Sequence, residues 1–238
     1  EYYEFFGDKN ESADTAYQLA VGTTGLVQKF DRFPVAVMPS KVYDEERSEW
    51  SSGEYVSGNI AIRADLEQRY IPTLAHETVH GLHDDLLKWD RTRSAYLDEG
   101  VAEHVSYLAR KKLYAEDRID AGTAEVFGED SEYVEYDGSR RITYTRSSEG
   151  DREELWNYYR DDRDFMKTWS PSDGNREFGY AYSELIVKNY LRNGGELSEL
   201  YRYIRGTERI ADPEQKWQYL SGAIDLEPCN YDSRDRFD

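Results

Sequence analysis

The sequence predicts an α+β fold, with a small mixed β-sheet in an N-terminal lobe and a mainly helical C-terminal lobe. The clearest strand-like apolar runs lie before residue 65, whereas apolar residues after residue 70 recur at helical spacing. A chain of 238 residues can bury one sizeable core, and it shows no internal repeat. We therefore expect a single domain over 1–238, with lobes of about 1–90 and 91–238.

The N-terminal lobe is expected to begin with a helix over 12–30 that Ser12 caps and that is interrupted near Gly22. Strands are expected next over 33–40 and 58–64, because both are short apolar runs and the second one alternates. The charged stretch between them contains "SSGEYVSG" and is predicted to form a loop or a hairpin.

Two consecutive helices are predicted over 72–88 and 95–112. Pro72 suits the first turn of a helix, and apolar residues then recur every three or four positions. The second helix ends in "RKK", and such cations favour a helix C-terminus. Residues 114–150 are acidic and weakly periodic, so we expect a long excursion with a hairpin around "EYDGSRRITY". The remaining helices are predicted near 151–167, 177–192, 196–205 and 213–224.

The composition excludes several function classes. A formal net charge of −19 repels phosphates, so we expect no nucleic acid partner, and an acid excess of this kind suits a surface kept hydrated in a high-salt source. No apolar run is long enough to span a membrane. Cys229, the single cysteine, cannot form an intramolecular disulfide or a thiolate metal site. A secreted or cell-surface protein whose signal was removed before Glu1 fits these features, while the compartment and the oligomeric state stay open.

The stretch "HETVH" at 76–80 indicates a metal site. His76 and His80 are separated by one helical turn, so both imidazoles can reach one ion. Glu77 would lie beside that ion and could take a proton from a water that the metal acidifies. Glu99 follows His80 after eighteen residues, enough for the chain to turn and return as an antiparallel helix that supplies a third ligand. The small residues Gly100 and Ala102 would let the two helices approach closely.

The motif and its spacing resemble the gluzincin metallopeptidases, a group that includes thermolysin and aminopeptidase N. "HETVH", eighteen residues and "DEG" are similar to the aminopeptidase pattern, in which "NEG" stands third. The resemblance implies a thermolysin-like fold of the small minigluzincin type and one catalytic Zn²⁺. It also implies that His76, His80 and Glu99 bind zinc and that Glu77 is the general base.

Further roles are implied by the same resemblance. Glu103 would hydrogen-bond a zinc histidine, although a solvated helix carboxylate is the alternative. Tyr180 would steady the oxyanion from the helix that contains "FGYAYSEL", with Tyr182 as second choice and a packing role as the alternative. The strand "GNIAI" would be the edge strand that pairs with an extended peptide. It has Ala61 where aminopeptidases have a glutamate that holds the substrate amine, so an endopeptidase is favoured.

Two histidines are expected to lie outside the ligand set. His83 is seven residues, or roughly 10 Å of helix, from His76, too far to share one zinc with both other histidines. We expect it at the rim of the site or behind a ligand. His104 is expected to face away from the metal.

The function predicted from these features is zinc-dependent hydrolysis of a peptide bond in a peptide or protein substrate. One alternative is a catalytically inactive binding or scaffold protein that keeps the zinc. A second alternative is a chance motif in a tyrosine-rich domain that binds carbohydrates or surfaces.

Overall fold

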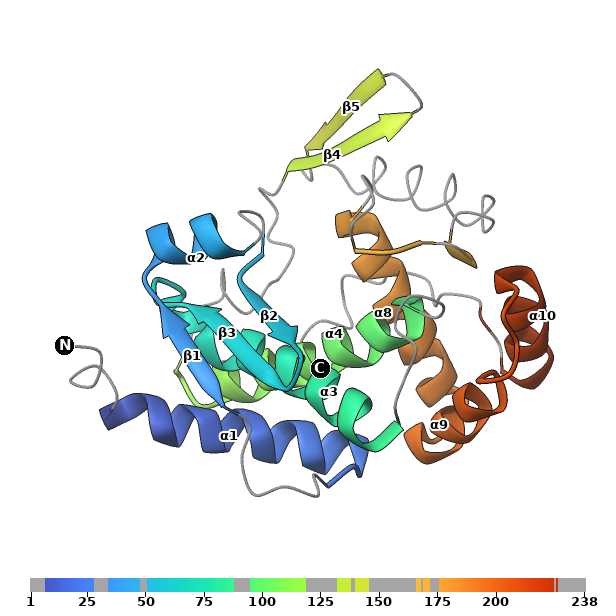
Figure 1. The fold of residues 1–238 in the computed structure, drawn as a ribbon, viewed down its shortest axis with the longest axis horizontal. Coiled ribbons are helices and arrows are strands. Elements are labelled where there is room, and N and C mark those ends of the chain that lie inside the picture. Colours follow the sequence, from blue (N-terminus) through green and yellow to red (C-terminus); the bar gives the residue numbers. More distant parts are fainter. Residues whose placement is uncertain are drawn as a thin grey trace. The chain divides into compact units, whose positions relative to one another are not determined.

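The computed structural model describes residues 7–27, 34–47, 51–87, 95–118, 132–137, 140–145, 166–167, 169–171, 176–224 and 226. This part of the chain combines a small three-stranded sheet with a majority of helices (Figure 1). The chain forms two compact units, one of residues 1–89 and 105–124 and the other of residues 90–104 and 125–238. The sequence predicts one domain with lobes of about 1–90 and 91–238, and residues 105–124 group here with the first unit. No helix in the described segments is both long and apolar enough to cross a membrane.

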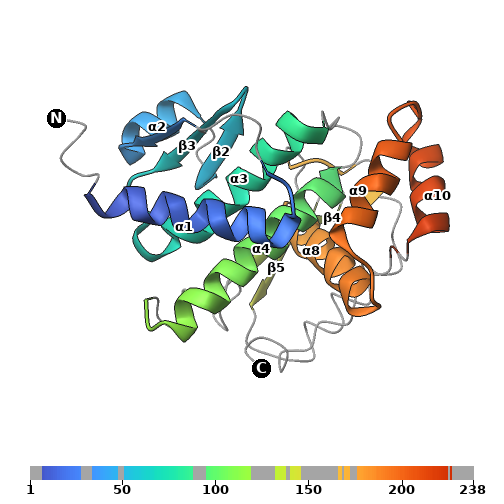
Figure 2. The same cartoon turned by 90° about the horizontal axis from the view of Figure 1, so that it is seen from below.

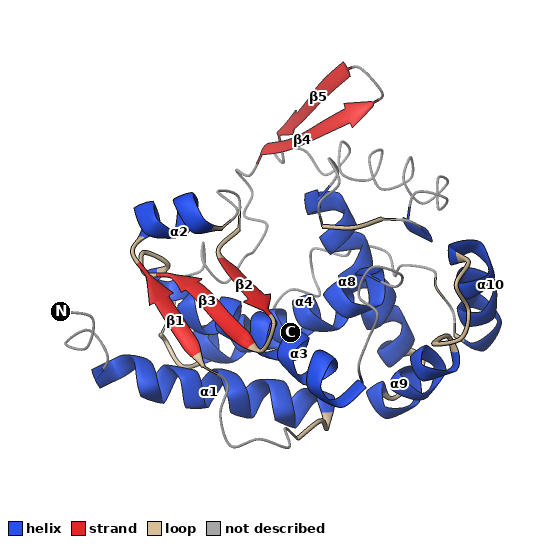
Figure 3. Ribbon diagram, viewed as in Figure 1, coloured by secondary structure: helices blue, strands red, loops and turns tan. Residues whose placement is uncertain are grey.

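The sheet of the first unit has the order β1-β3-β2 (Figure 3). Strand β1 (Val35–Met38) is parallel to β3 (Asn59–Arg63), and β2 (Gly53–Val56) is antiparallel to β3. Ser57 and Gly58 connect β2 to β3 with positive φ angles of 49° and 86°, the backbone of a tight hairpin turn. Both predicted strands are confirmed, and the stretch predicted as a loop or a hairpin contains β2, which forms a hairpin with β3. The sequence prediction missed a short helix, α2 (Ser40–Glu46), between β1 and β2.

Helix α1 (Gly7–Thr24) differs from the predicted helix over 12–30. Ser12 lies inside the helix and does not cap it, and the helix continues through Gly22. The helix ends instead before Gly25, which adopts a φ of +68° and whose N–H donates to the carbonyl of Val21. Gly22 lowers the helix propensity by only about 1 kcal/mol relative to alanine, a cost that packing can offset. Ala16 and Ala20 supply that packing, since both are fully buried.

Helix α3 (Tyr70–Leu87) packs against α1 and against one face of the sheet, as Figures 1 and 2 show from two sides. The helix predicted over 72–88 is confirmed, with Pro72 in its first turn. The apolar face of α3 is buried: the side chains of Leu74, Val79 and Leu82 are at most 1% exposed. Burial of three such side chains contributes roughly 1.5–3 kcal/mol each.

Helix α4 (Ala95–Ala115) confirms the second predicted helix and extends three residues beyond it. Buried residues recur at every fourth position along its whole length. Leu97 and Val101 belong to the second unit, and Val105, Ala109 and Leu113 belong to the first. Leu108, which was predicted on this face, keeps intermediate exposure.

The second unit contains the hairpin and the C-terminal helices that the sequence predicted. Strands β4 (Glu132–Asp137) and β5 (Arg140–Thr145) form the antiparallel hairpin. Helices α8 (Arg176–Arg192), α9 (Leu197–Gly206) and α10 (Pro213–Ala223) agree with three predicted segments, and most of the fourth, 151–165, lies outside the described residues. The core of this unit includes Tyr182, Ile186, Leu200 and Leu220, which are fully buried.

His104 on α4 makes the stability of this unit sensitive to acid. Burial of its imidazole, together with the nearby charge of Lys188, lowers its pKa from 6.5 to about 4. The folded state therefore binds fewer protons than the unfolded state between these pH values. The stabilisation is complete above pH 6.5 and is lost as pH falls toward 4.

The free energy of unfolding should fall between pH 7 and pH 4, and we expect His104→Gln to make this fall smaller by up to about 3 kcal/mol. The measurement is urea unfolding of the metal-free protein, which removes metal release as a second cause of acid sensitivity. Parallel stability curves for the two proteins would show that His104 does not titrate as its surroundings imply.

Candidate metal centre

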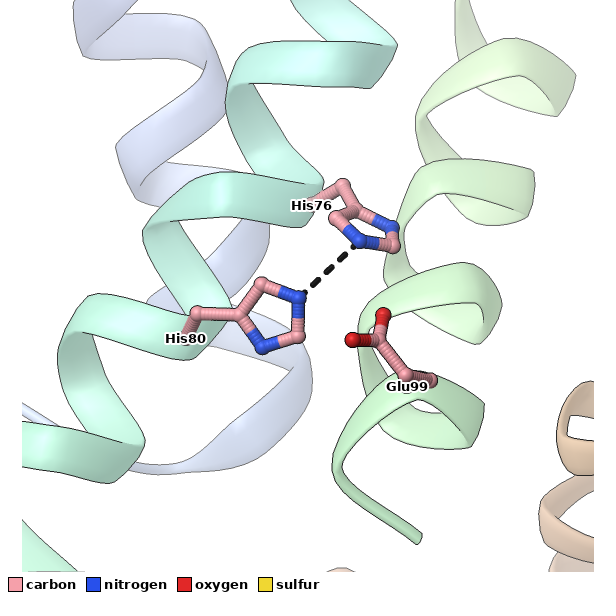
Figure 4. A group of neighbouring side chains, drawn as sticks. All are labelled: His76, His80 and Glu99. Carbon is pink, nitrogen blue, oxygen red and sulfur yellow. Dashed lines mark hydrogen bonds between the residues drawn. The ribbon is translucent and has the colours of Figure 1, made fainter. Parts of the chain in front are cut away.

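Helix α3 places His76 and His80 on one face with their imidazoles turned toward each other (Figure 4). Their Nε2 atoms lie 3.0 Å apart, and the rings meet nearly edge to face at an interplanar angle of 79°. The pair is shielded from solvent, with exposed fractions of 9% for His76 and 2% for His80. The two ring nitrogens are within hydrogen-bond distance of each other, and nitrogens this close could also serve as two ligands of one metal ion.

Glu99 supplies the third donor from α4 (Figure 4). One ligand atom from each of His76, His80 and Glu99 lies within 4.8 Å of the other two. Glu99 is only 4% exposed. A buried carboxylate is costly unless a cation or hydrogen-bond donors compensate its charge, and a metal ion is one such partner. The structure therefore brings together the three residues that the sequence predicted as ligands, and they could hold a metal ion.

Glu77 lies next to this group but is not one of its members. It is 6% exposed and follows His76 directly on α3. Strand β2 passes beside it, since a Cβ added to Gly53 would lie 3.0 Å from the Glu77 Cγ and 2.8 Å from the Thr73 Cγ2. Because Gly53 has no side chain, β2 can pack closely against the Cγ methylene group of Glu77. This contact was not predicted from the sequence.

Helix α8 packs against α4 directly beside Glu99. A Cβ on Gly100 would lie 2.3 Å from the carbonyl oxygen of Ser183 and 2.9 Å from the Cγ2 of Val187. Ser183 and Val187 are both fully buried. The sequence predicts that Gly100 and Ala102 admit the histidine helix; the nearest atoms at the missing side chain of Gly100 belong to α8. This contact fixes the turn of α4 that carries Glu99.

The two candidate tyrosines of α8 differ in exposure. Tyr180 is partly exposed, and its ring meets that of Trp169 at 5.5 Å and an angle of 82°. Tyr182 is completely buried. Tyr180 precedes Ser183 by three residues, so the two residues lie on about the same side of α8. Ser183 contacts Gly100 of α4 through its backbone carbonyl. A hydroxyl that must meet a substrate needs an accessible ring, which favours Tyr180.

The structure buries His83 completely, so it does not lie at a rim. His83, His80 and Asp98 offer ligand atoms that all lie within 4.8 Å of one another, and this second group could also hold a metal ion. Among the described residues, no such group contains both His83 and His76, in keeping with their predicted separation on the helix. Asp98 is 1% exposed and was missed, although it stands in the "DEG" motif. Glu103 lies one turn beyond Glu99 and keeps intermediate exposure.

The strand predicted as a peptide-binding edge is in fact central. Strand β3 has β1 on one side and β2 on the other, so the described edges are β1 and β2. The N–H of Arg63 donates to the carbonyl of Ser52, and bonded pairs alternate along an antiparallel ladder. The backbone groups of Gly53 and Tyr55 therefore point away from β3. They form the free edge of β2 within the described residues.

Comparison with known proteins gave no match, whether with family models, with curated proteins or with solved structures. The resemblance to gluzincins is therefore carried by the motif residues alone.

Proposed function

We propose that this protein is a zinc-dependent peptidase with a thermolysin-like catalytic fold. One observation carries the proposal: His76, His80 and Glu99 converge as a buried set of two imidazoles and one carboxylate. Two histidines and one glutamate are the donors of catalytic zinc sites, which keep a fourth position for water. Structural zinc sites instead use four protein ligands, usually with cysteine, and this chain has only Cys229.

The separation of the two imidazoles supports zinc in particular. Two Zn–N bonds of about 2.0–2.1 Å at the tetrahedral angle place their nitrogens about 3.3 Å apart. The Nε2 atoms of His76 and His80 lie 3.0 Å apart, so an opening of a few tenths of an ångström would admit the ion. Calcium and magnesium prefer oxygen ligands and fit this nitrogen-rich set poorly.

In this proposal Glu77 moves the proton. Zinc, when bound, acts as a Lewis acid that acidifies water and polarises the substrate carbonyl. Glu77 accepts the proton of the attacking water and passes it to the amine of the leaving peptide. Its 6% exposure keeps competing water away from the carboxylate, and β2 beside it limits its rotation. The hydroxyl of Tyr180 donates a hydrogen bond to the oxyanion that forms at the carbonyl.

The free edge of β2 is the proposed docking site for the peptide. An extended peptide can pair with the outward backbone groups of Gly53 and Tyr55 as an added strand. Gly53 packs beside Glu77, and the Tyr55 hydroxyl donates to Asp84 on α3 at 2.8 Å, so β2 follows the active-site helix. A peptide on this edge would therefore run past the general base.

We continue to favour an endopeptidase, although for a different reason. Ala61 lies on β3, which is not an edge strand, so its lack of a carboxylate does not decide the question. The edge strand β2 does carry Glu54, a possible holder of a substrate amine. Side chains alternate along a strand, and Gly53 faces α3, so Glu54 projects from the opposite face of the sheet. Glu54 is thus directed away from the face that packs on Glu77.

The test is digestion of a peptide library whose members have blocked or free N-termini. We expect internal cleavage of both kinds, loss of cleavage with 1,10-phenanthroline and recovery with added zinc. Cleavage confined to free N-termini would identify an aminopeptidase. Stoichiometric zinc without any cleavage would support the inactive scaffold protein, and cleavage that resists the chelator would refute a metal mechanism.

A further inference from the structure

Trp169 lies flat against the first turn of α8. A Cβ on Gly179 would lie 1.9 Å from the Cε2, 2.2 Å from the Nε1 and 2.3 Å from the Cζ2 of the indole, far inside any real contact. Trp169 is only 3% exposed. The indole therefore occupies the space that a side chain at position 179 would need, and only glycine permits this packing.

The same indole restrains the ring of Tyr180. The two ring centroids are 5.5 Å apart and the planes meet at 82°, an edge-to-face arrangement that aromatic pairs prefer. Tyr180 has intermediate exposure, so part of its surface meets solvent while its ring packs on Trp169. Removal of the indole would leave the ring of Tyr180 without its T-shaped neighbour.

The segment that carries Trp169 is itself held in place. Met166 is fully buried, and the Lys167 Nζ lies 2.7 Å from the Glu214 Oε2 of α10. The Lys167 side chain is 18% exposed, so this ion pair is partly shielded. Trp169 is thus presented to α8 from an anchored segment, which makes it a firm support for a neighbouring ring.

We propose that Trp169 is a positioning residue that holds the Tyr180 ring in the orientation needed to stabilise the oxyanion. This inference rests on the proposed function, in which Tyr180 donates to the oxyanion. A catalytic donor must be held to within about 0.5 Å by packing partners. Displacement by about 1 Å can cost up to about 100-fold in rate.

A double-mutant cycle tests the coupling. Tyr180→Phe is expected to lower kcat by about 10²–10³-fold, the usual effect of losing one oxyanion donor. Trp169→Leu should lower kcat by about 10–100-fold, with KM and zinc affinity nearly unchanged. Trp169→Leu added to Tyr180→Phe should then cause little further loss, because the ring it positions no longer carries a hydroxyl. Fully additive losses would overturn the proposal, and Trp169→Phe serves as the milder variant if the leucine protein does not fold.

A second measurement is independent of activity. In protein labelled with 3-fluorotyrosine, the ¹⁹F resonance of Tyr180 is identified by its absence in Tyr180→Phe. We expect this resonance to move toward the solvent-exposed position in Trp169→Leu. Gly179→Ala should produce the same shift with the tryptophan still present, because its Cβ must displace the indole.

Gly222→Ala on α10 is the matched control, since no atom in the described part of the chain, apart from the helix around it, lies within 4 Å of its Cβ position. An unchanged resonance in both Trp169→Leu and Gly179→Ala would refute the positioning role. If the wild-type protein cleaves no peptide, the proposed function fails, but the ¹⁹F spectra still decide whether Trp169 orders Tyr180.

Discussion

Glu77→Gln is expected to lower kcat by at least about 10²–10⁴-fold while the protein keeps its zinc. The amide has nearly the same size as the carboxylate but cannot accept the proton of the attacking water. Zinc should remain because Glu77 is not one of the three converging donors. The measurement pairs steady-state cleavage of a fluorogenic peptide with metal analysis of the same sample.

Glu11→Gln provides the matched control for this change. Glu11 lies exposed on α1 in the same unit, so the same chemical substitution should leave both cleavage and zinc content unaltered. A Glu77→Gln protein that cleaves peptides at the wild-type rate would show that another group is the general base.

Gly100→Ala should destabilise the protein by at least about 2 kcal/mol and weaken its affinity for zinc. The added Cβ would meet the Ser183 carbonyl oxygen at 2.3 Å, and a backbone atom of a buried helix cannot rotate aside. Helices α4 and α8 must separate, and the turn that carries Glu99 must move with α4. Urea unfolding and a zinc competition assay measure the two effects.

Gly22→Ala gives the opposite expectation for the same substitution. Gly22 lies within α1, and among the described residues no atom outside its own stretch of helix lies within 4 Å of its Cβ position. Helix propensity alone should then stabilise the protein by up to about 1 kcal/mol. Equal stability of the Gly100→Ala protein and the wild type would contradict the close packing at Gly100.

Elements with strong periodicity or clear turn signals could be predicted from the sequence. Helices α3 and α4 followed from apolar spacing, and the hairpin of β4 and β5 followed from "YDGSR" between two Tyr-rich runs. Helix α2 was missed because Tyr43 is its one buried residue, which leaves no periodic pattern. The predicted helix over 12–30 runs past Gly25, whose left-handed conformation ends α1 at Thr24, because apolar spacing alone does not show which glycine adopts a positive φ.

In the candidate site, too, features set by local spacing could be predicted, whereas features set by tertiary packing could not. His76, His80 and Glu99 could be predicted because a helical turn and a helix hairpin impose their spacing. The order of the strands could not, because local alternation does not reveal which strand lies at an edge. Contacts between distant segments were equally hidden, as the packing of Gly53 beside Glu77 and of Trp169 over Gly179 illustrates. Such contacts depend on tertiary packing, and the only trace of them in the sequence is a glycine whose role the sequence does not reveal.

The metal content of the purified protein tests the central claim most directly. We expect one zinc per chain after equilibration with zinc and removal of the excess. Glu99→Ala, which removes one of the three donors, should lose stoichiometric zinc. The two donor groups share His80, and we assign the ion to the group with His76 and Glu99. Absence of stoichiometric zinc from the wild-type protein would contradict the account, and so would two ions per chain or undiminished zinc in Glu99→Ala.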